Sequence, residues 1–482
     1  MSITSAFNTA MTGLTAAGLA SSVVSENLAN ALTPGYAKRT LDLTSSASTV
    51  GVQVVGINRN IDPAIQSGRR STEAELGNAQ VQADFYSQLT TLVGDISDPF
   101  SISARLTNFE SSLIEAASSP DSGPRLDDLA LQAEALANSI SEAAEGLRDM
   151  RTAAEGSIDV QVDIINQALK DVEKLNARIM VSEAGGMNTA ALQDQRAQLI
   201  DTVNEIIPVT MIQRSNGQVA LFSEGGSILL DGKAAELTFD SVPDTMPHMT
   251  QDNGLLSGLS INGIPIDTGP DGAIKGGTLA ANFEVRDVFA VDAQADLDAM
   301  AADLIERFQD TSLDTTLGAT DPGLFTDNGG FFNAANTVGI SNRLELNDLV
   351  SMDGVGETWR LRDGLNAAAI GNAGDSSLLQ GYTDALEVMR TVSSGGGMGT
   401  TTVSAASLSA NLLSHFTQSS TSADQELSFA SASFSAMSQM ELAQAVDSDE
   451  ELQNLMLIEQ AYAANAKVMT VVDELMETLL RI

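Results

Sequence analysis

The sequence predicts a mainly helical protein of several nested domains, with a β-containing middle domain and terminal helices that pair into a coiled-coil rod domain. Apolar residues recur at spacings of three and four at both ends of the chain. Aromatic residues make up only 4% of the 482 residues, which favours close helix–helix contacts over a core of large rings. After residue 206, the helical spacing gives way to the alternation typical of strands.

The N-terminal segment should form a helix with a coiled-coil seam. Its stripe keeps heptad spacing and has one polar member. The members are Ile3, Phe7, Ala10, Leu14, Ala17, Ser21, Val24 and Leu28. Gly13 and Gly18 each weaken a helix by about 1 kcal/mol relative to alanine. We therefore expect this segment to be marginally stable without a partner.

A turn should follow this helix. Thr33 precedes a proline, which disfavours the helical conformation, and Pro34-Gly35 fits the central pair of a type II turn. The helix is therefore expected to end near Ala31 or Leu32.

Two asparagines and two extended segments surround the turn. Asn27 and Asn30 have short amides that can bond the turn backbone. Beyond Tyr36, the alternating stretches TLDLTSS and VGVQVVGINRNID predict strands or extended arms.

The C-terminal segment, residues 448–482, should be a helix about 50 Å long at 1.5 Å per residue. Its stripe comprises Leu455, Ile458, Tyr462, Asn465, Met469, Val472, Met476 and Leu479. Acidic residues 449–451 suit a helix N-terminus, and Asn465 is a polar stripe residue that can fix register.

The two terminal stripes can bury each other by pairing, although each could instead pack on its own domain. Pairing would leave Leu452, Leu475 and Ile482 pointing outward, where neighbouring subunits could cover them.

Helical and strand patterns alternate between the ends. Helices are expected over 65–117, interrupted at Asp98-Pro99, and over 126–183, interrupted at Gly146 and Gly156. Asn-Gly and Gly-Gly pairs after residue 207 indicate β-hairpins. Further along, the patterns predict helices at 290–308, 377–392 and 405–445, a loop-rich segment at 309–376 and a flexible glycine-rich joint at 393–399.

These patterns divide the chain into three nested domains. Residues 1–60 and 446–482 form the terminal rod domain with its extended arm. A helical core domain comprises 61–206, 277–310 and 377–445, and a β-containing outer domain comprises 207–276 and 311–376.

Composition excludes several classes of function. The formal charge is −40, from 64 acidic and 24 basic residues, so the chain should bind neither nucleic acid nor anionic membranes, which need clustered cations. Without cysteine, disulfides and thiolate catalysis are excluded. The uncharged first 25 residues lack the basic start of a cleavable signal peptide, and no transmembrane segment is evident.

No catalytic, cofactor or metal site is expected, and the chain should not be an enzyme. His248 and His415 are the only histidines and lie far apart in sequence. The stretch GGSILLDGKA differs from a phosphate loop, because its glycines are one residue too far apart and Ala234 stands where serine or threonine is needed.

Several stretches resemble axial proteins of the bacterial flagellum. NLANALTPGYAKR is similar to the helix-ending signature of these proteins, and DEELQNLMLIEQAYAANAKVMTVVDELMETLL is similar to their C-terminal helix. Interior stretches resemble the FlgK family of hook-associated proteins in particular, namely GINRNID, LTNFESSLIEAASSPDSGPR, EKLNARI, NTAALQDQRAQLID and GGTLAANFEVRD. Where members of that family usually have Leu-Asp-Gln-Arg-Asp, this chain reads LQDQRA at 192–197.

The resemblance implies a structural adapter at the hook–filament junction, in the extracellular flagellum and exported by a type III route without a cleavable signal peptide. Implied partners are copies of itself in a tubular assembly, the hook protein, a second junction protein or flagellin, and an export chaperone. The assembly interface is expected to include Leu14, Leu28, Asn30, Pro34, Gly35, Tyr36, Leu455, Tyr462, Asn465, Met469 and Leu479. Alternatives are a hook or distal-rod subunit, or a secreted enzyme with a helical export domain.

Overall fold

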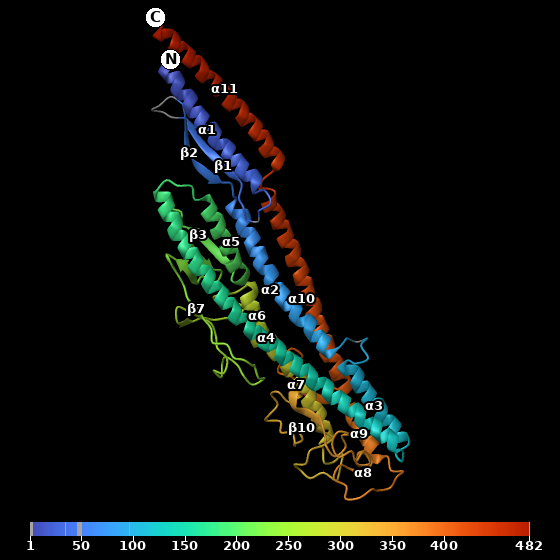
Figure 1. Ribbon diagram of the computed structural model, residues 1–482. Coiled ribbons are helices and arrows are strands. Elements are labelled where there is room, and N and C mark those ends of the chain that lie inside the picture. The colour runs from blue at the N-terminus through green and yellow to red at the C-terminus, as the bar shows by residue number, and fades with distance from the viewer. Residues whose placement is uncertain (1–2, 34, 46–50, 96, 482) are drawn as a thin grey trace.

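The computed structural model describes residues 3–33, 35–45, 51–95 and 97–481. The chain is elongated and mainly helical, with both termini at one end and short antiparallel sheets further along (Figure 1). Helices α1 (Ile3–Ala29) and α11 (Ser448–Leu480) lie side by side. The predicted fold class and the predicted pairing of the two ends are confirmed.

The terminal rod consists of α1, α11 and the hairpin of β1 (Arg39–Ser45) and β2 (Val52–Arg59). Both strands agree with the predicted extended segments. They pair antiparallel with Arg39 opposite Arg59 at the base of the hairpin, and both strands contact α1. Asp447 caps α11, because its carboxylate accepts hydrogen bonds from the N–H groups of Asp449 and Glu450.

Helix α1 ends at Ala29, earlier than predicted, because the backbone tightens before the proline. The N–H of Thr33 bonds the carbonyl of Asn30, and the N–H of Tyr36 bonds that of Thr33. Gly35 has φ +74°, as the third residue of a type II turn requires. Pro34, predicted as the second residue of that turn, lies outside the described residues.

The helical body is built on helices that run along the molecule (Figure 1). They are α2 (Pro63–Val93), α3 (Ile102–Ser118), α4 (Gly123–Ala184), α5 (Ala190–Ile206) and α10 (Ala405–Leu442). Helix α4 is continuous over 62 residues, so the predicted interruptions at Gly146 and Gly156 are wrong. A Cβ at position 146 would lie 2.5 Å from the side chain of Leu92, so glycine there allows α2 to pack closely.

A small β region flanks the C-terminal half of α4. Its first sheet contains β3 (Val209–Gln213), β4 (Val219–Ser223), β5 (Ile228–Asp231) and β6 (Lys233–Ala234), and its second contains β7 (Leu237–Thr238), β8 (Ser260–Ile261) and β9 (Ile264–Pro265). The predicted Asn-Gly turn joins β3 to β4, with positive φ at Asn216 and Gly217. From α4, Ile158, Val162, Ile165, Leu169 and Val172 pack beneath this region in one apolar cluster.

A second and larger apolar cluster fills the end of the molecule opposite the termini. Besides the long helices, the elements around it are the π-helical turn Val285–Phe289, α7 (Ala290–Phe308), β10 (Phe325–Asp327), the 3₁₀ turn Ser341–Arg343, β11 (Leu344–Leu346), α8 (Arg360–Asp363), α9 (Ser377–Glu387), β12 (Arg390–Ser393) and β13 (Thr400–Val403). Helix α6 (Gly277–Glu284) instead contributes Leu279 and Phe283 to the cluster beside α4. Apolar residues of 311–376 belong to this cluster, whereas those of 207–276 belong to the cluster beside α4. The two segments grouped from sequence thus pack in different places.

The glycine-rich stretch 393–399 is not a joint. It forms the loop of the β12–β13 hairpin, and the N–H of Met398 donates to the carboxylate of Asp296. A Cβ at Gly396 would lie 2.4 Å from the carbonyl oxygen of Asp292, so the loop is packed tightly on α7.

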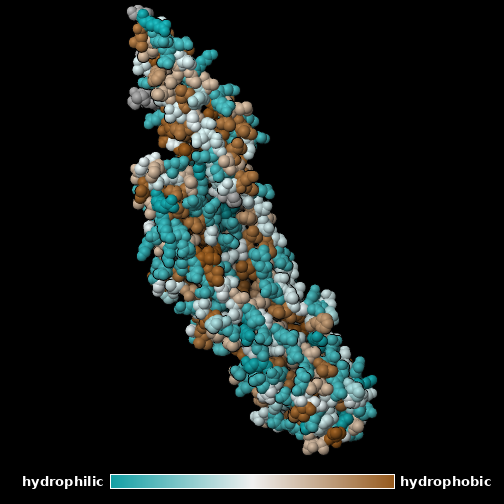
Figure 2. Space-filling model, viewed as in Figure 1, coloured by the Kyte–Doolittle hydropathy of each residue, from teal (hydrophilic) through white to brown (hydrophobic). Residues whose placement is uncertain are grey.

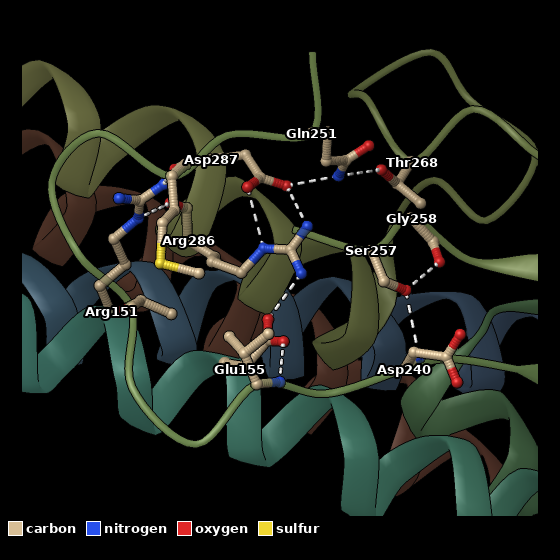
Figure 3. A network of polar contacts seen from close by, with 12 residues as sticks. Arg151, Glu155, Asp240, Gln251, Ser257, Gly258, Thr268, Arg286 and Asp287 are labelled. Carbon is tan, nitrogen blue, oxygen red and sulfur yellow. Dashed lines mark hydrogen bonds and ion pairs between the residues drawn. The ribbon is translucent and has the colours of Figure 1, made fainter. Parts of the chain in front are cut away.

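A buried ionic network fastens the loop after β7 to the helical body (Figure 3). Arg286, in the π-helical turn, bonds Glu155 of α4 at 2.6 Å and Asp287 at 2.7 Å. Arg151 donates to the carbonyls of Arg286, Met246 and Met249. Both side chains of the Arg286–Glu155 pair are fully buried.

Candidate assembly interface

Small residues bring α1 close to its neighbours in the terminal rod. Its buried side chains are Ala10, Ala16, Ala17, Val23, Val24 and Asn27. On α11, Val472 is the buried apolar residue, and Leu455, Asn465 and Met469 are half-buried. Leu14, from the predicted stripe of α1, is also half-buried. The predicted stripes therefore meet along the middle of the pair.

Asn465 packs on Gly13 of α1. A Cβ at position 13 would lie 2.8 Å from the Asn465 amide nitrogen, whereas a Cβ at Gly18 would meet nothing within 4 Å. Glycine at position 13 therefore creates the space for a polar side chain in the seam. This contact fits the prediction that Asn465 fixes the register of the pair.

These two glycines form a matched test of the helix pair. Leucine at either position should raise intrinsic helix stability by about 0.5–1 kcal/mol. Gly18→Leu should therefore slow amide exchange in α1. Gly13→Leu should speed exchange in both α1 and α11, because its side chain separates the helices. Slower exchange in both variants would contradict the close contact at Gly13.

Other predicted interface residues face outward. Leu28 is 37% exposed, Tyr462 is 50% exposed and Leu479 is 58% exposed. Leu452 and Leu475 are also exposed, as the pairing predicted, and Ile482 lies outside the described residues.

Together with further apolar side chains, these residues form the outer face of the rod. We define this outer face as Met11, Leu19, Leu28, Leu452, Met456, Leu457, Tyr462, Val468, Val471, Leu475, Met476, Leu479 and Leu480. In Figure 2, brown side chains are scattered over the part of the surface formed by the two terminal helices. So many exposed apolar side chains on two adjoining helices are typical of a protein–protein interface.

Asn27 ties the end of α1 to the turn, to β1 and to α11. It is only 1% exposed. Its amide oxygen accepts from the Tyr36 hydroxyl at 2.8 Å and from the N–H of Arg39 at 3.0 Å. Its amide nitrogen donates to the carbonyl of Arg39 at 2.9 Å and to Glu451 at 3.2 Å. One side chain thus satisfies groups on three elements.

Charged residues surround Asn27. Lys38 bridges Glu450 at 3.0 Å and Glu451 at 3.3 Å, which joins the turn to the first turn of α11. Burial lowers the pKa of Lys38, but hydrogen bonds to the two glutamates outweigh this effect and leave the pKa raised. The Arg39 guanidinium lies 4.8 Å from the centre of the Tyr36 ring.

The sequence identified some residues of this cluster and missed others. Asn27 was expected to bond the turn backbone; it instead bonds the backbone of Arg39 in β1 and, in the turn, the Tyr36 hydroxyl. Asn30 instead bonds within its own helix end, to the carbonyl of Glu26. The role of Glu451 was missed, because its partner Asn27 is 424 residues away and an acid at a helix start already has a local explanation.

Asn27→Ala should loosen the junction of α1 with α11. It leaves the Arg39 backbone groups and the Glu451 carboxylate without this partner, at a cost of about 1–3 kcal/mol in local opening free energy. Amide exchange in residues 451–460 should be correspondingly faster. Asn30→Ala is the matched control and should change the opening free energy by about 0.5 kcal/mol or less. Equal effects of the two variants would contradict the central position of Asn27.

Two further kinds of feature are not found among the described residues. Across 3–33, 35–45, 51–95 and 97–481, no His, Asp and Glu side chains are grouped as metal ligands would be. Every helix in those ranges is too short or too polar to cross a membrane.

Three family models match the chain. Residues 7–36 match the flagella basal body rod protein, residues 86–325 match the helical domain of the flagellar hook-associated protein FlgK, and residues 437–482 match the C-terminal region of the flagellar basal body rod FlgEFG proteins. The first and last matches cover parts of the terminal rod, and the second covers most of the helical body and the β region.

Relatives named flagellar hook-associated protein 1 are similar to the chain. The Salmonella typhimurium protein is 29% identical over 243 residues, which are 48% of this chain and 44% of that protein. The chain thus spans less than half the length of this relative. The Bacillus subtilis protein is 24% identical over 516 residues, covering 98% of this chain and 97% of that protein.

A solved structure, the flagellar hook junction protein FlgK from Burkholderia pseudomallei, is 17% identical, with a TM-score of 0.45 over 54% of this chain and 46% of that one. The ordered set of family models, together with a relative aligned over nearly the whole chain, establishes the relationship. The chain belongs to the FlgK family of flagellar hook-associated proteins.

Proposed function

We propose that this chain is a structural adapter at the hook–filament junction of the bacterial flagellum and that it assembles through its terminal rod. The observation that carries the proposal is the outer face of the rod, where apolar side chains on α1 and α11 lie exposed in the monomer. The names of the relatives support the location in the flagellum. The role is one of assembly and load transfer, not of catalysis.

The partners follow from this role. Copies of the same chain would cover the outer face in a tubular assembly, with the hook protein on one side and a second junction protein or flagellin on the other. An export chaperone would shield the same apolar surface before export. The charge of −40 argues against nucleic acid and anionic membranes as partners.

The interface residues divide by position. Leu28, Tyr462 and Leu479 would contact neighbouring subunits. Leu14, Leu455, Asn465 and Met469 would hold α1 and α11 together, and Asn30, Pro34, Gly35 and Tyr36 would shape the turn.

We also propose that the rod and the helical body are separate domains. Residues 207–276 would be an outer domain, and 311–376 would form the tip of the body.

Another axial subunit, of the hook or the distal rod, is the nearest rival. The continuous α4 and its match to the FlgK helical domain favour the junction protein. A secreted enzyme would need a site of converging catalytic groups, and the described residues instead show the exposed apolar rod.

Location in the assembled organelle tests this proposal. In the chain's own host with its gene deleted, a tagged copy should restore filament attachment. Gold-labelled antibody should mark a single band where hook and filament meet. Labelling along the whole hook or filament would favour another axial subunit and overturn the junction role.

A further inference from the structure

The terminal rod joins the rest of the molecule without sharing its apolar core. Among the described residues, the two large apolar clusters include none from 3–60 and none from 443–481. A hollow of about 590 Å³ lies at this elbow, lined by residues that include Leu32, Tyr36, Arg69 and Val446. Something other than apolar packing must therefore set the angle between the rod and the body.

Asp194, in α5 of the body, holds both strands of the rod hairpin. It is 8% exposed. One carboxylate oxygen bonds Arg39 at 3.2 Å and the other bonds Arg59 at 2.7 Å. The two arginines stand opposite each other at the hairpin base, where like charges repel. The carboxylate between them offsets this repulsion, in addition to Glu26 of α1, which bonds Arg39 at 2.7 Å, and it fastens the hairpin to α5.

The same face of α5 receives the turn and helix α2. Asp194, Gln198 and Asp201 are spaced four and three residues apart, so they share one helix face. A Cβ at Gly35 would lie 2.7 Å from the Gln198 amide nitrogen, so the turn rests on this side chain. Asp201 bonds Arg69 and Arg70 of α2, each at 2.7 Å. Asp194 and Asp201 therefore each form ion pairs with two arginines.

Helix α5 is itself a rigid support. Arg196, two residues after Asp194, is 5% exposed. Its guanidinium donates to Asn176 of α4 at 2.8 Å and to the carbonyl of Gly217, in the β3–β4 turn, at 2.6 Å. The sequence Asp194-Gln195-Arg196 thus links the rod on one side with α4 and the β region on the other.

We infer that Asp194 is a positioning residue that holds the terminal rod at one angle to the helical body, by bridging Arg39 and Arg59 of the hairpin. If Asp194 loses its charge, the two neighbouring arginines repel each other. The two chain segments that connect the rod with the body, near residues 61 and 445, then act as a free hinge. The inference concerns the monomer, so its failure would leave the proposed function untouched.

Distances between spin labels in the free monomer test this inference. Because the chain has no cysteine, Lys170→Cys in α4 and Lys467→Cys in α11 place two labels at exposed sites without background. Asp194→Asn should broaden the distribution of label distances by about twofold or more, as a hinge would. Circular dichroism should show unchanged helix content. Asp163→Asn, an exposed carboxylate in α4, is the matched control and should leave the distribution narrow.

Two further variants separate positioning from general damage. Asp194→Glu keeps the charge and should restore most of the narrow distribution. The double variant Arg39→Gln/Arg59→Gln removes the bridge without leaving buried arginines unpaired, and it should broaden the distribution as Asp194→Asn does. A distribution as narrow as that of the parent, in either Asp194→Asn or the double variant, would overturn the inference.

Discussion

A chain that lacks residues 448–482 should keep a folded helical body and yet fail to enter the flagellum. Helix α11 packs mainly on α1, and no described residue of α11 belongs to the two large apolar clusters. Its removal therefore costs the body little, while it removes most of the outer face of the rod. Circular dichroism of the purified protein and labelling of flagella in the host measure the two effects. Deleting residues 1–32 should give the same pair of results.

Substitutions can separate loss of the outer face from loss of a helix. Leu457→Ser/Leu475→Ser removes two side chains that are 63% and 48% exposed, so the monomer should remain stable while incorporation falls strongly. Val160→Ser/Val181→Ser, on α4, is the matched control at 58% and 63% exposure, and it should incorporate normally. Normal incorporation of the truncated chain or of the rod variant would contradict assembly through the rod.

Glu155→Ala should produce a large loss of stability in the body. It removes one of the two carboxylates that pair with the buried guanidinium of Arg286 and leaves Asp287 as the other, so the loss should approach the cost of about 3–5 kcal/mol for a broken buried pair. It also removes the acceptor for the N–H of Val242, so the loop after β7 should loosen first. Denaturant unfolding followed by circular dichroism measures the change in free energy.

Two controls distinguish an unpaired charge from lost packing. Glu155→Leu/Arg286→Met replaces both charges with apolar side chains, and it should recover much of the loss. Arg214→Ala breaks an exposed pair with Asp231 and should cost less than about 1 kcal/mol. A double variant as unstable as Glu155→Ala would show that the network contributes through its shape and hydrogen bonds, not through charge pairing.

The features predicted well from sequence depend on local spacing. Apolar periodicity correctly located the paired terminal helices, and the Asn-Gly pair correctly located the β3–β4 hairpin. The same local reasoning failed at Gly146, where a tertiary contact with Leu92 uses the missing side chain. It failed again at 393–399, where the glycines allow the loop to lie against α7. A glycine that permits close packing looks the same in sequence as one that ends a helix.

The polar residues of the elbow could not be predicted in the same way, since their partners are distant in sequence. Asp194 lies 155 residues from Arg39 and 135 residues from Arg59. The resemblance to the FlgK family included the stretch around Asp194, but it did not indicate which residues Asp194 contacts. The π-helical turn that carries Arg286 was not expected either, because the helical spacing continues on both sides of it.

Chemical protection of one rod position before and after assembly tests the central claim most directly. Leu457→Cys provides a single thiol on the outer face, where the native side chain is 63% exposed. In the free monomer this thiol should react with a maleimide as fast as a thiol at Val181→Cys on α4. In intact flagella it should be protected while the α4 thiol still reacts. Equal reactivity of both thiols in the assembled organelle would mean that the rod has no neighbours there, and it would contradict assembly through the terminal helices.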